Sequence, residues 1–283
     1  MANFNKHIVI VGTARSGTSW LSETIARQHR YRMLFEPEHE TRTKRGYLIC
    51  DQWIETRSEA EEAYRYLRQV FQNRVDCDWI AQNSNRKYKR HLLPFIPKMF
   101  VIKFVRANLS AQFINETFHI PVVHIIRNPY DVIRSQQQVS FPWLFDLSIF
   151  SKQDKLVDKI METFNYDIRR YSNLNPIEQL TLRWCIENVL PLEVLGGYTR
   201  QSKIIKYEDL SRDLNVFLEL CHQFSLEPIS NVKEFYRTPS SKTHPDSQII
   251  TQKNKAKNTF SVSERKAINN LLDIFETELY PRE

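Results

Sequence analysis

The stretch Gly12-Thr-Ala-Arg-Ser-Gly-Thr-Ser-Trp20 lies between an apolar, β-branched run, His7 to Val11, and a segment that favours a helix, Thr18 to Gln28. A buried strand, a tight loop with glycines and a helix open many nucleotide-binding α/β domains. Such a loop directs backbone N–H groups and the positive end of a helix dipole at an anion. The stretch therefore predicts an α/β fold whose first strand ends in a phosphate-binding loop.

Four further apolar runs have the continuous pattern of strands buried on both faces of a parallel sheet. They are Tyr31 to Phe35, Met99 to Val105, Pro121 to Ile126 and Ser202 to Tyr207. Helices are predicted at Ser58 to Gln72, Leu109 to Phe118, Pro129 to Gln138, Lys152 to Tyr171, Pro176 to Leu195, Leu210 to Phe224 and Ser263 to Glu278. This alternation indicates βαβ crossovers. We therefore expect an α/β fold of the P-loop nucleotide-binding type, a single domain over residues 1–283, with a central four- to five-stranded parallel sheet flanked by helices.

The composition is that of a compact globular protein. Hydrophobic residues make up 41% of the 283 residues, charged residues 26%, and there are 5 glycines, which argues against disorder and against collagen-like repeats. The net charge of +7 favours anionic ligands without requiring nucleic acid. No run reaches the roughly 18 to 20 apolar residues of a membrane span, and the start lacks the pattern of a signal peptide. We expect a soluble, cytoplasmic protein with no membrane span and no nucleic-acid partner.

The phosphate loop departs from that of ATP-using enzymes. Thr18 stands where a Walker A loop has its phosphate-binding lysine. That lysine and a magnesium-holding carboxylate are needed when a γ-phosphoryl group is transferred. The strand Pro121 to Ile126, which is placed to supply such a carboxylate, ends in Arg127. These two absences disfavour an ATPase or a kinase.

A second anion site is predicted at the end of the same strand. Asn128 is a helix N-cap residue, and proline follows it at the first helical position. Arg127 leaves the strand beside this helix start, and Ser135 lies about two turns further along the helix. A guanidinium and a hydroxyl can thus converge on one phosphate. The alternative is an ordinary capped helix with a surface arginine.

Together these segments resemble the motifs of one enzyme family. Arg15-Ser-Gly-Thr-Ser-Trp20 resembles the 5′-phosphosulfate loop of sulfotransferases that use 3′-phosphoadenosine-5′-phosphosulfate (PAPS), and Arg127-Asn-Pro-x-Asp-x-x-x-Ser135 resembles their 3′-phosphate motif. Lys206-Tyr-Glu-Asp-Leu210 is similar to a segment that follows a later strand, so the resemblance covers roughly residues 6–210. It implies a single α/β domain with a parallel sheet, PAPS as donor, adenosine 3′,5′-bisphosphate (PAP) as product, and no metal.

The resemblance also implies roles for individual residues. The 5′-phosphosulfate would be held by Arg15, Ser16, Gly17, Thr18 and Ser19. Arg127 and Ser135 would hold the 3′-phosphate. Trp20 matches an aromatic residue near the adenine, with helix–sheet packing as the alternative, and Tyr207 would lie at the edge of the base. The family segment that completes the 3′-phosphate site in cytosolic members is not found in the basic stretch Lys242 to Lys257.

Sulfonate transfer needs a general base for the acceptor proton and cations near the developing charge. Phe35-Glu36-Pro37 resembles a segment of carbohydrate sulfotransferases in which a carboxylate is a candidate base, so we predict Glu36 as the base. His39 is its rival. Lys103 matches a family lysine near the sulfonate, and Arg106 is a weaker candidate for the same task. In the place of the histidine that serves cytosolic members, this chain has none.

The sequence thus predicts an enzyme that transfers a sulfonate group from PAPS to a hydroxyl or amine. The resemblance at Phe35-Glu36-Pro37 alone favours a carbohydrate or a small-molecule glycoside as acceptor. Two alternatives stay open: a P-loop kinase-like phosphotransferase, and a catalytically silent nucleotide-binding protein. The sequence indicates no oligomeric state.

Overall fold

The protein is described here by a computed structural model. It describes residues 4–28, 31–75, 77–81, 99–236, 238, 240, 241 and 260–283. The chain divides into two compact units. The first unit comprises residues 1–127 and 197–242, and the second comprises residues 128–196 and 243–283. Each unit is considered by itself below, and the expectation of one domain over residues 1–283 stays a prediction.

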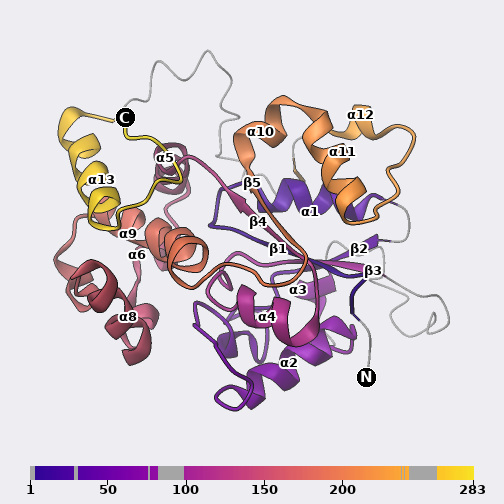
Figure 1. Ribbon diagram of the computed structural model, residues 1–283, viewed down its shortest axis with the longest axis horizontal. Coiled ribbons are helices and arrows are strands. Elements are labelled where there is room, and N and C mark those ends of the chain that lie inside the picture. Colours follow the sequence, from indigo (N-terminus) through magenta and orange to yellow (C-terminus); the bar gives the residue numbers. More distant parts are fainter. Residues whose placement is uncertain are drawn as a thin grey trace. The chain divides into compact units, whose positions relative to one another are not determined.

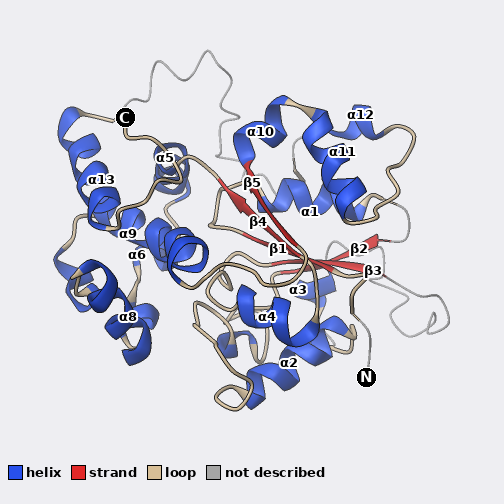
Figure 2. Cartoon of the chain, in the orientation of Figure 1, coloured by secondary structure: helices blue, strands red, loops and turns tan. Residues whose placement is uncertain are grey.

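The first unit is built on a five-stranded parallel sheet (Figures 1 and 2). Its strands are β1 (Ile8–Val11), β2 (Tyr31–Phe35), β3 (Met99–Lys103), β4 (Val122–Ile126) and β5 (Ser202–Lys206), in the spatial order β2-β3-β1-β4-β5. Every residue of β1 and β4 is buried, because helices cover both faces of the sheet. The predicted α/β fold with a four- to five-stranded parallel sheet is confirmed.

The chain changes direction across the sheet after β1. It passes first to β2 at one edge and then returns through β3 to β4 and β5 on the other side of β1. Because parallel crossovers are right-handed, a reversal of direction moves the connecting helix to the other face. The loop after β1 therefore lies at the point where the strand order reverses, which is where ligands bind in open α/β sheets.

Helices of the first unit form a layer on each face of the sheet (Figure 1). On one face lie α1 (Thr18–Ala26), α10 (Tyr207–Arg212), α11 (Leu214–Gln223) and α12 (Val232–Tyr236). On the other face lie α2 (Glu61–Phe71) and α4 (Ala111–Phe118). Two short helices, η1 (Gly46–Leu48) and α3 (Asp78–Ala81), belong to the connection between β2 and β3. Alternate residues of β1 point to the two cores, Ile8 and Ile10 to the first and Val9 and Val11 to the second.

The described part of the second unit is helical. It contains α5 (Pro129–Val139), α6 (Pro142–Phe145), α7 (Ser148–Ser151), α8 (Asp154–Phe164), η2 (Ile168–Asn173), α9 (Pro176–Val189), η3 (Leu190–Val194) and α13 (Val262–Ile274). Helix α9 packs against α5, α6 and α13 and is its central element. Arg183 of α9 is fully buried, where it pairs with Glu187 and donates to the backbone carbonyls of Trp143, Leu144 and Asp146.

Some predicted helices are divided in the structure. The predicted helix Lys152 to Tyr171 ends at Asn165, which takes a left-handed conformation with φ of 51°. The predicted helix Leu210 to Phe224 begins earlier, at Tyr207, and is interrupted at Asp213, whose side chain caps α11 by accepting from the Asn215 N–H. Both breaks occur at residue types that favour turns and helix caps over helix interiors.

Candidate active site at the carboxyl ends of the strands

The loop between β1 and α1 is closely packed at its glycines. A Cβ atom on Gly12 would lie 2.4 Å from the carbonyl oxygen of Ile125, and one on Gly17 would lie 2.4 Å from the ring of Tyr207. Gly17 also has a φ of 96°, which other residues rarely adopt. It is the N-cap of α1, and no side chain caps this helix. The first N–H groups of α1 are therefore directed at the loop, the arrangement that binds anions.

Two guanidinium groups lie beside this loop. Arg127, at the end of β4, donates from Nη1 to the carbonyl of Arg15 at 2.9 Å, and its guanidinium lies 4.7 Å from the centre of the Tyr207 ring. The pKa of Arg15 is lowered, first by burial and then by the positive charge of Arg127. Holding two like charges together costs free energy that a bound anion would offset. The structure thus brings Arg15, Arg127 and Tyr207 together in the first unit.

Trp20 and Tyr207 belong to a cluster of aromatic residues. The Trp20 ring meets those of Tyr207 and Tyr236 edge to face, at centroid distances of 6.3 Å and 4.9 Å. Its indole N–H donates to the Tyr236 carbonyl at 3.2 Å. Trp20 is thereby held against α12 by packing and by a hydrogen bond. A face open for stacking on adenine stays a prediction, as does the place of Tyr207 at the edge of the base.

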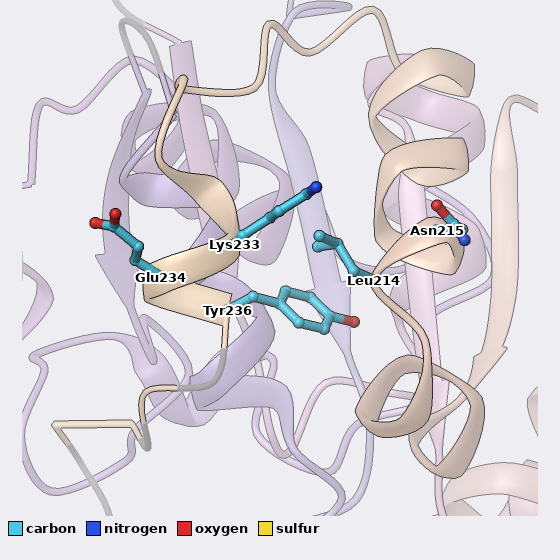
Figure 3. A pocket seen from close by; sticks show the side chains of 5 residues that line it. All are labelled: Leu214, Asn215, Lys233, Glu234 and Tyr236. Atoms are coloured by element: carbon cyan, nitrogen blue, oxygen red, sulfur yellow. The ribbon is translucent and has the colours of Figure 1, made fainter.

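Tyr236 also lines a pocket of about 670 Å³ between α12 and the start of α11. Lys233, Leu214 and Tyr236 extend toward one another there, whereas Glu234 points away (Figure 3). The fifth lining residue is Asn215. None of these residues belongs to the phosphate loop, but Tyr236 connects the pocket to Trp20, one of the predicted donor residues.

A carboxylate and a lysine meet at the ends of β2 and β3. The ammonium of Lys103 donates to Oε1 of Glu36, and the Glu36 N–H donates to the Lys103 carbonyl at 2.9 Å. The Lys103 side chain is only 3% exposed, whereas that of Glu36 is 19% exposed and reaches solvent. Glu36 has a φ of 41°, a strained conformation for a residue with a side chain. Lys103 is in register with Ile10 of the neighbouring strand β1, and β3 lies between Glu36 and β1.

His39 and Arg106 are placed differently from Glu36. His39 packs edge to face on Trp79 at 4.8 Å, and burial lowers its pKa. Arg106 forms a buried ion pair with Asp51 and a second ion pair with Glu40. Two carboxylates therefore occupy the Arg106 guanidinium, which is an anchor for the loop after β3.

One acidic residue of this region was not among the predicted site residues. Glu38 is 1% exposed, and its Oε1 accepts from the N–H groups of Val105 and Arg106 at 2.6 Å and 3.2 Å. Burial raises its pKa to about 7, and the negative charge of Glu36 raises it as well. The one sequence signal was the position of Glu38 two residues after Glu36. A glutamate in a polar turn is expected to be exposed, so the sequence did not indicate that this one is buried.

The predicted 3′-phosphate residues lie in different units. Arg127 ends the first part of the first unit, whereas Ser135 lies in α5 of the second unit and is 5% exposed. The Asn128 side chain caps α5 by accepting from the Tyr130 N–H, as its sequence predicts. Convergence of Arg127 and Ser135 on one phosphate stays a prediction.

The described residues contain no cluster of three or more histidine, cysteine or acidic side chains arranged to hold a metal ion. In the same part of the chain, no helix has both the length and the apolar character needed to cross a membrane.

A glycine loop at the strand-order reversal, with two guanidinium groups beside it, defines a class of protein: an α/β protein that binds a phosphorylated ligand. The particular family follows from the sequence, which matches the sulfotransferase domain model over residues 5–269. The chain belongs to the sulfotransferase family, and it is a PAPS-dependent sulfotransferase. The predicted family is thus confirmed, and sulfonate transfer is favoured over the kinase-like alternative.

Solved sulfotransferase structures are similar to this chain. The sulfotransferase domain from the curacin biosynthetic pathway is 16% identical, with 100% of this chain and 95% of that one covered and a TM-score of 0.44. The sulfotransferase domain of a Synechococcus olefin synthase is 16% identical, with 99% and 98% covered and a TM-score of 0.44. A mouse sulfotransferase complexed with PAP is 12% identical, with 96% and 84% covered and a TM-score of 0.43. Among proteins of curated function, none matches the chain.

Proposed function

We propose that this sulfotransferase transfers the sulfonate of PAPS to a hydroxyl group of a carbohydrate or small-molecule glycoside, with Glu36 as the general base. The observation that carries the proposal is the contact between Glu36 and Lys103 at the carboxyl ends of β2 and β3. It places a carboxylate and a cation one strand away from the phosphate loop.

The residues of the loop fit the donor. PAPS carries phosphate and sulfate oxygens, which match the first N–H groups of α1 and the guanidinium of Arg15. Burial first and the charge of Arg127 second lower the pKa of Arg15, and an anion bound between the two guanidinium groups would offset both effects. Ser16, Thr18 and Ser19 supply further N–H and hydroxyl donors in the same turn. The predicted binding of the 3′-phosphate by Ser135 is also part of the proposal.

In this proposal Glu36 and Lys103 have different roles in the reaction. PAPS, when bound, supplies an activated sulfonate that leaves a phosphate oxygen for the acceptor oxygen. Glu36 accepts the proton that the acceptor hydroxyl loses, and it is exposed enough to meet an incoming acceptor. Lys103 holds the Glu36 carboxylate in place and supplies positive charge near the leaving oxygen. These steps use no metal, and the absence of a metal requirement is part of the proposal.

The acceptor class rests on the Phe35-Glu36-Pro37 segment, which the structure describes at the end of β2. An incubation with radiolabelled PAPS tests it, using p-nitrophenyl glycosides, free disaccharides, 4-methylumbelliferone and an aromatic amine in parallel. We expect label in a glycoside or a disaccharide. Label found only in the phenol or the amine would contradict the acceptor class but not the donor. A cytoplasmic location and a lack of nucleic-acid partners belong to the same proposal.

The donor site is tested by calorimetric titration with PAP, 5′-AMP and ATP. We expect PAP to bind most tightly, by a factor on the order of 10 to 100 over 5′-AMP, because Arg127 adds a charge-assisted contact to the 3′-phosphate. The substitution Arg127→Met should remove this preference. Equal affinities of the wild-type protein for PAP and 5′-AMP would contradict the 3′-phosphate site.

The base is tested by comparing Glu36→Gln with His39→Gln. Glu36→Gln should keep PAP affinity within a few-fold and reduce transfer by a factor on the order of 100 or more. His39→Gln should retain most of the activity, because the His39 ring is held against Trp79. The reverse pattern would assign the base to His39, and PAP binding without turnover in the wild-type protein would favour the silent nucleotide-binding alternative.

A further inference from the structure

A second carboxyl group lies beside the Glu36–Lys103 pair. The turn after β2 lies along the end of β3: Lys103 donates to Glu36, and the N–H groups of Val105 and Arg106, shortly after β3, donate to Glu38. Burial raises the pKa of Glu38 most, the negative charge of Glu36 raises it further, and the positive charge of Lys103 lowers it. Its Oε1 accepts two backbone N–H groups, whereas its buried Oε2 has no hydrogen-bond partner among the described residues. A buried carboxylate oxygen without a hydrogen-bond partner costs free energy. Holding the backbone N–H groups explains Oε1 but not the burial of Oε2.

The main chain around Glu38 is held rigidly. The Pro37 carbonyl accepts from the Tyr66 hydroxyl at 2.6 Å and from Thr43 Oγ1 at 3.2 Å. A Cβ atom on Gly46 would lie 2.6 Å from the Glu38 carbonyl oxygen, so Gly46 packs directly on this backbone. These contacts hold the backbone of the turn that carries both Glu36 and Glu38.

Two further titratable groups interact electrostatically with Glu38, Tyr66 and Cys50, and both are neutral near pH 7. Burial raises the pKa of Tyr66, on α2, to about 12. Burial also raises the pKa of Cys50, in the loop after β2, far above its usual value. Glu36 and Lys103 are charged groups that act on Glu38. Arg106 and its ion-pair partners Asp51 and Glu40 act, like Glu38, on Cys50.

We propose that Glu38 is a positioning residue for sulfonate transfer, whose carboxylate places a second negative charge against the Glu36–Lys103 pair and so favours transfer of the acceptor proton to Glu36. This inference rests on the proposed role of Glu36. Two effects act in the same direction. Ionised Glu38 repels the charge of Glu36, and it also competes with Glu36 for the positive charge of Lys103.

The charge state of Glu38 makes the effect depend on pH. Because burial, followed by the charge of Glu36, brings the pKa of Glu38 to about 7, the group is protonated below neutral pH and ionised above it. Activity should therefore rise as the pH increases through about 7.

The test compares wild type with Glu38→Gln, whose amide oxygen still accepts the N–H groups of Val105 and Arg106. The measured quantity is kcat/KM with the best acceptor of the panel, between pH 5.5 and 9. We expect Glu38→Gln to lose the rise near pH 7 and to be slower than wild type by about 10-fold at pH 8.5, the order of magnitude for removing a unit charge near a partly buried base. PAP affinity at each pH serves as the control.

An unchanged pH profile in Glu38→Gln would overturn the proposal. If that variant does not fold, the carboxyl group can be followed in wild type and Glu36→Gln by NMR with carbon-13-labelled glutamate. We expect one carboxyl resonance to titrate near pH 7 in wild type and at lower pH in Glu36→Gln, because the charge of Glu36 raises the pKa of Glu38. The absence of such a resonance, or a midpoint that Glu36→Gln leaves unchanged, would also overturn it.

The two proposals fail in different ways. Full activity in Glu36→Gln contradicts the assignment of the base, whatever Glu38→Gln shows. An inactive Glu36→Gln beside a Glu38→Gln with wild-type activity and pH profile leaves the base intact and removes only Glu38.

Discussion

Replacing Gly17 with alanine adds one methyl group at a crowded point of the phosphate loop. The φ of 96° disfavours any L side chain and costs about 1–2 kcal/mol. The new Cβ would also lie 2.4 Å and 2.8 Å from two carbons of the Tyr207 ring. Overpacking of this kind costs about 1–3 kcal/mol more. We therefore expect Gly17→Ala to lower the free energy of unfolding of the first unit by about 2–5 kcal/mol.

Gly197→Ala is the matched control. Gly197 lies in the first unit and has a φ of 68°, but a Cβ atom there would have no neighbour within 4 Å. It should show the backbone cost alone, about 1–2 kcal/mol. The difference between the two variants, about 1–3 kcal/mol, then measures the packing of the Tyr207 ring on the loop.

Urea denaturation, combined with hydrogen exchange of the amides in β1, measures the stability of the first unit. A double mutant that adds Tyr207→Ala to Gly17→Ala should recover the packing part of the loss, because the cycle isolates the contact. Calorimetry with PAP should show weakened binding in Gly17→Ala and unchanged binding in Gly197→Ala. If Gly17→Ala is no more destabilising than Gly197→Ala, the contact between loop and ring is refuted.

Two further predictions concern buried charge. Arg183→Met should lower the stability of the second unit by about 3–5 kcal/mol in urea denaturation, because it removes the cation that pairs with the buried carboxylate of Glu187. Arg169→Met, at the exposed pair with Asp154, should cost less than about 1 kcal/mol, and equal losses would contradict this account. His7 is held neutral, with Nε2 bonded to the Phe71 carbonyl and Nδ1 to the Phe100 N–H, and burial lowers its pKa to about 4. The unfolded state then binds more protons between pH 6.5 and 4, so stability present above pH 6.5 should fall by about 3 kcal/mol across this window. His7→Gln should flatten that part of the stability curve, and an equally steep curve in the variant would assign the loss to other groups.

The strands could be predicted from sequence to within two residues at each end. Continuous β-branched runs such as His7 to Val11 have no other stable place than a sheet covered on both faces. Helix interruptions were harder. At Asp213 the apolar periodicity predicts one continuous helix, whereas the aspartate favours a new helix start. The structure shows the second, with the Asp213 side chain capping α11.

The positions of candidate site residues could be predicted where a local backbone motif determines them. They could not be predicted where long-range packing buries the residue. The phosphate loop places Arg15 through sequence-local geometry, and Arg127 follows from the end of an apolar strand. The role of Glu38 could not be predicted, because its carboxyl group is held by the N–H groups of Val105 and Arg106, which are distant in the sequence. Tyr236 likewise meets Trp20 across 216 positions.

The reversal of strand order after β1 separates two kinds of charge. Toward β4, positive charge gathers at Arg15 and Arg127 beside the phosphate loop. Toward β2, the carboxyl groups of Glu36 and Glu38 share the one ammonium of Lys103. In the proposed reaction, the phosphates of the donor lie on the first side and Lys103, on the strand next to β1, attracts the leaving oxygen, whereas the neutral acceptor hydroxyl approaches Glu36 on the second side. The strand order that brings the loop to the middle of the sheet would thus separate the donor's phosphates from the proposed base.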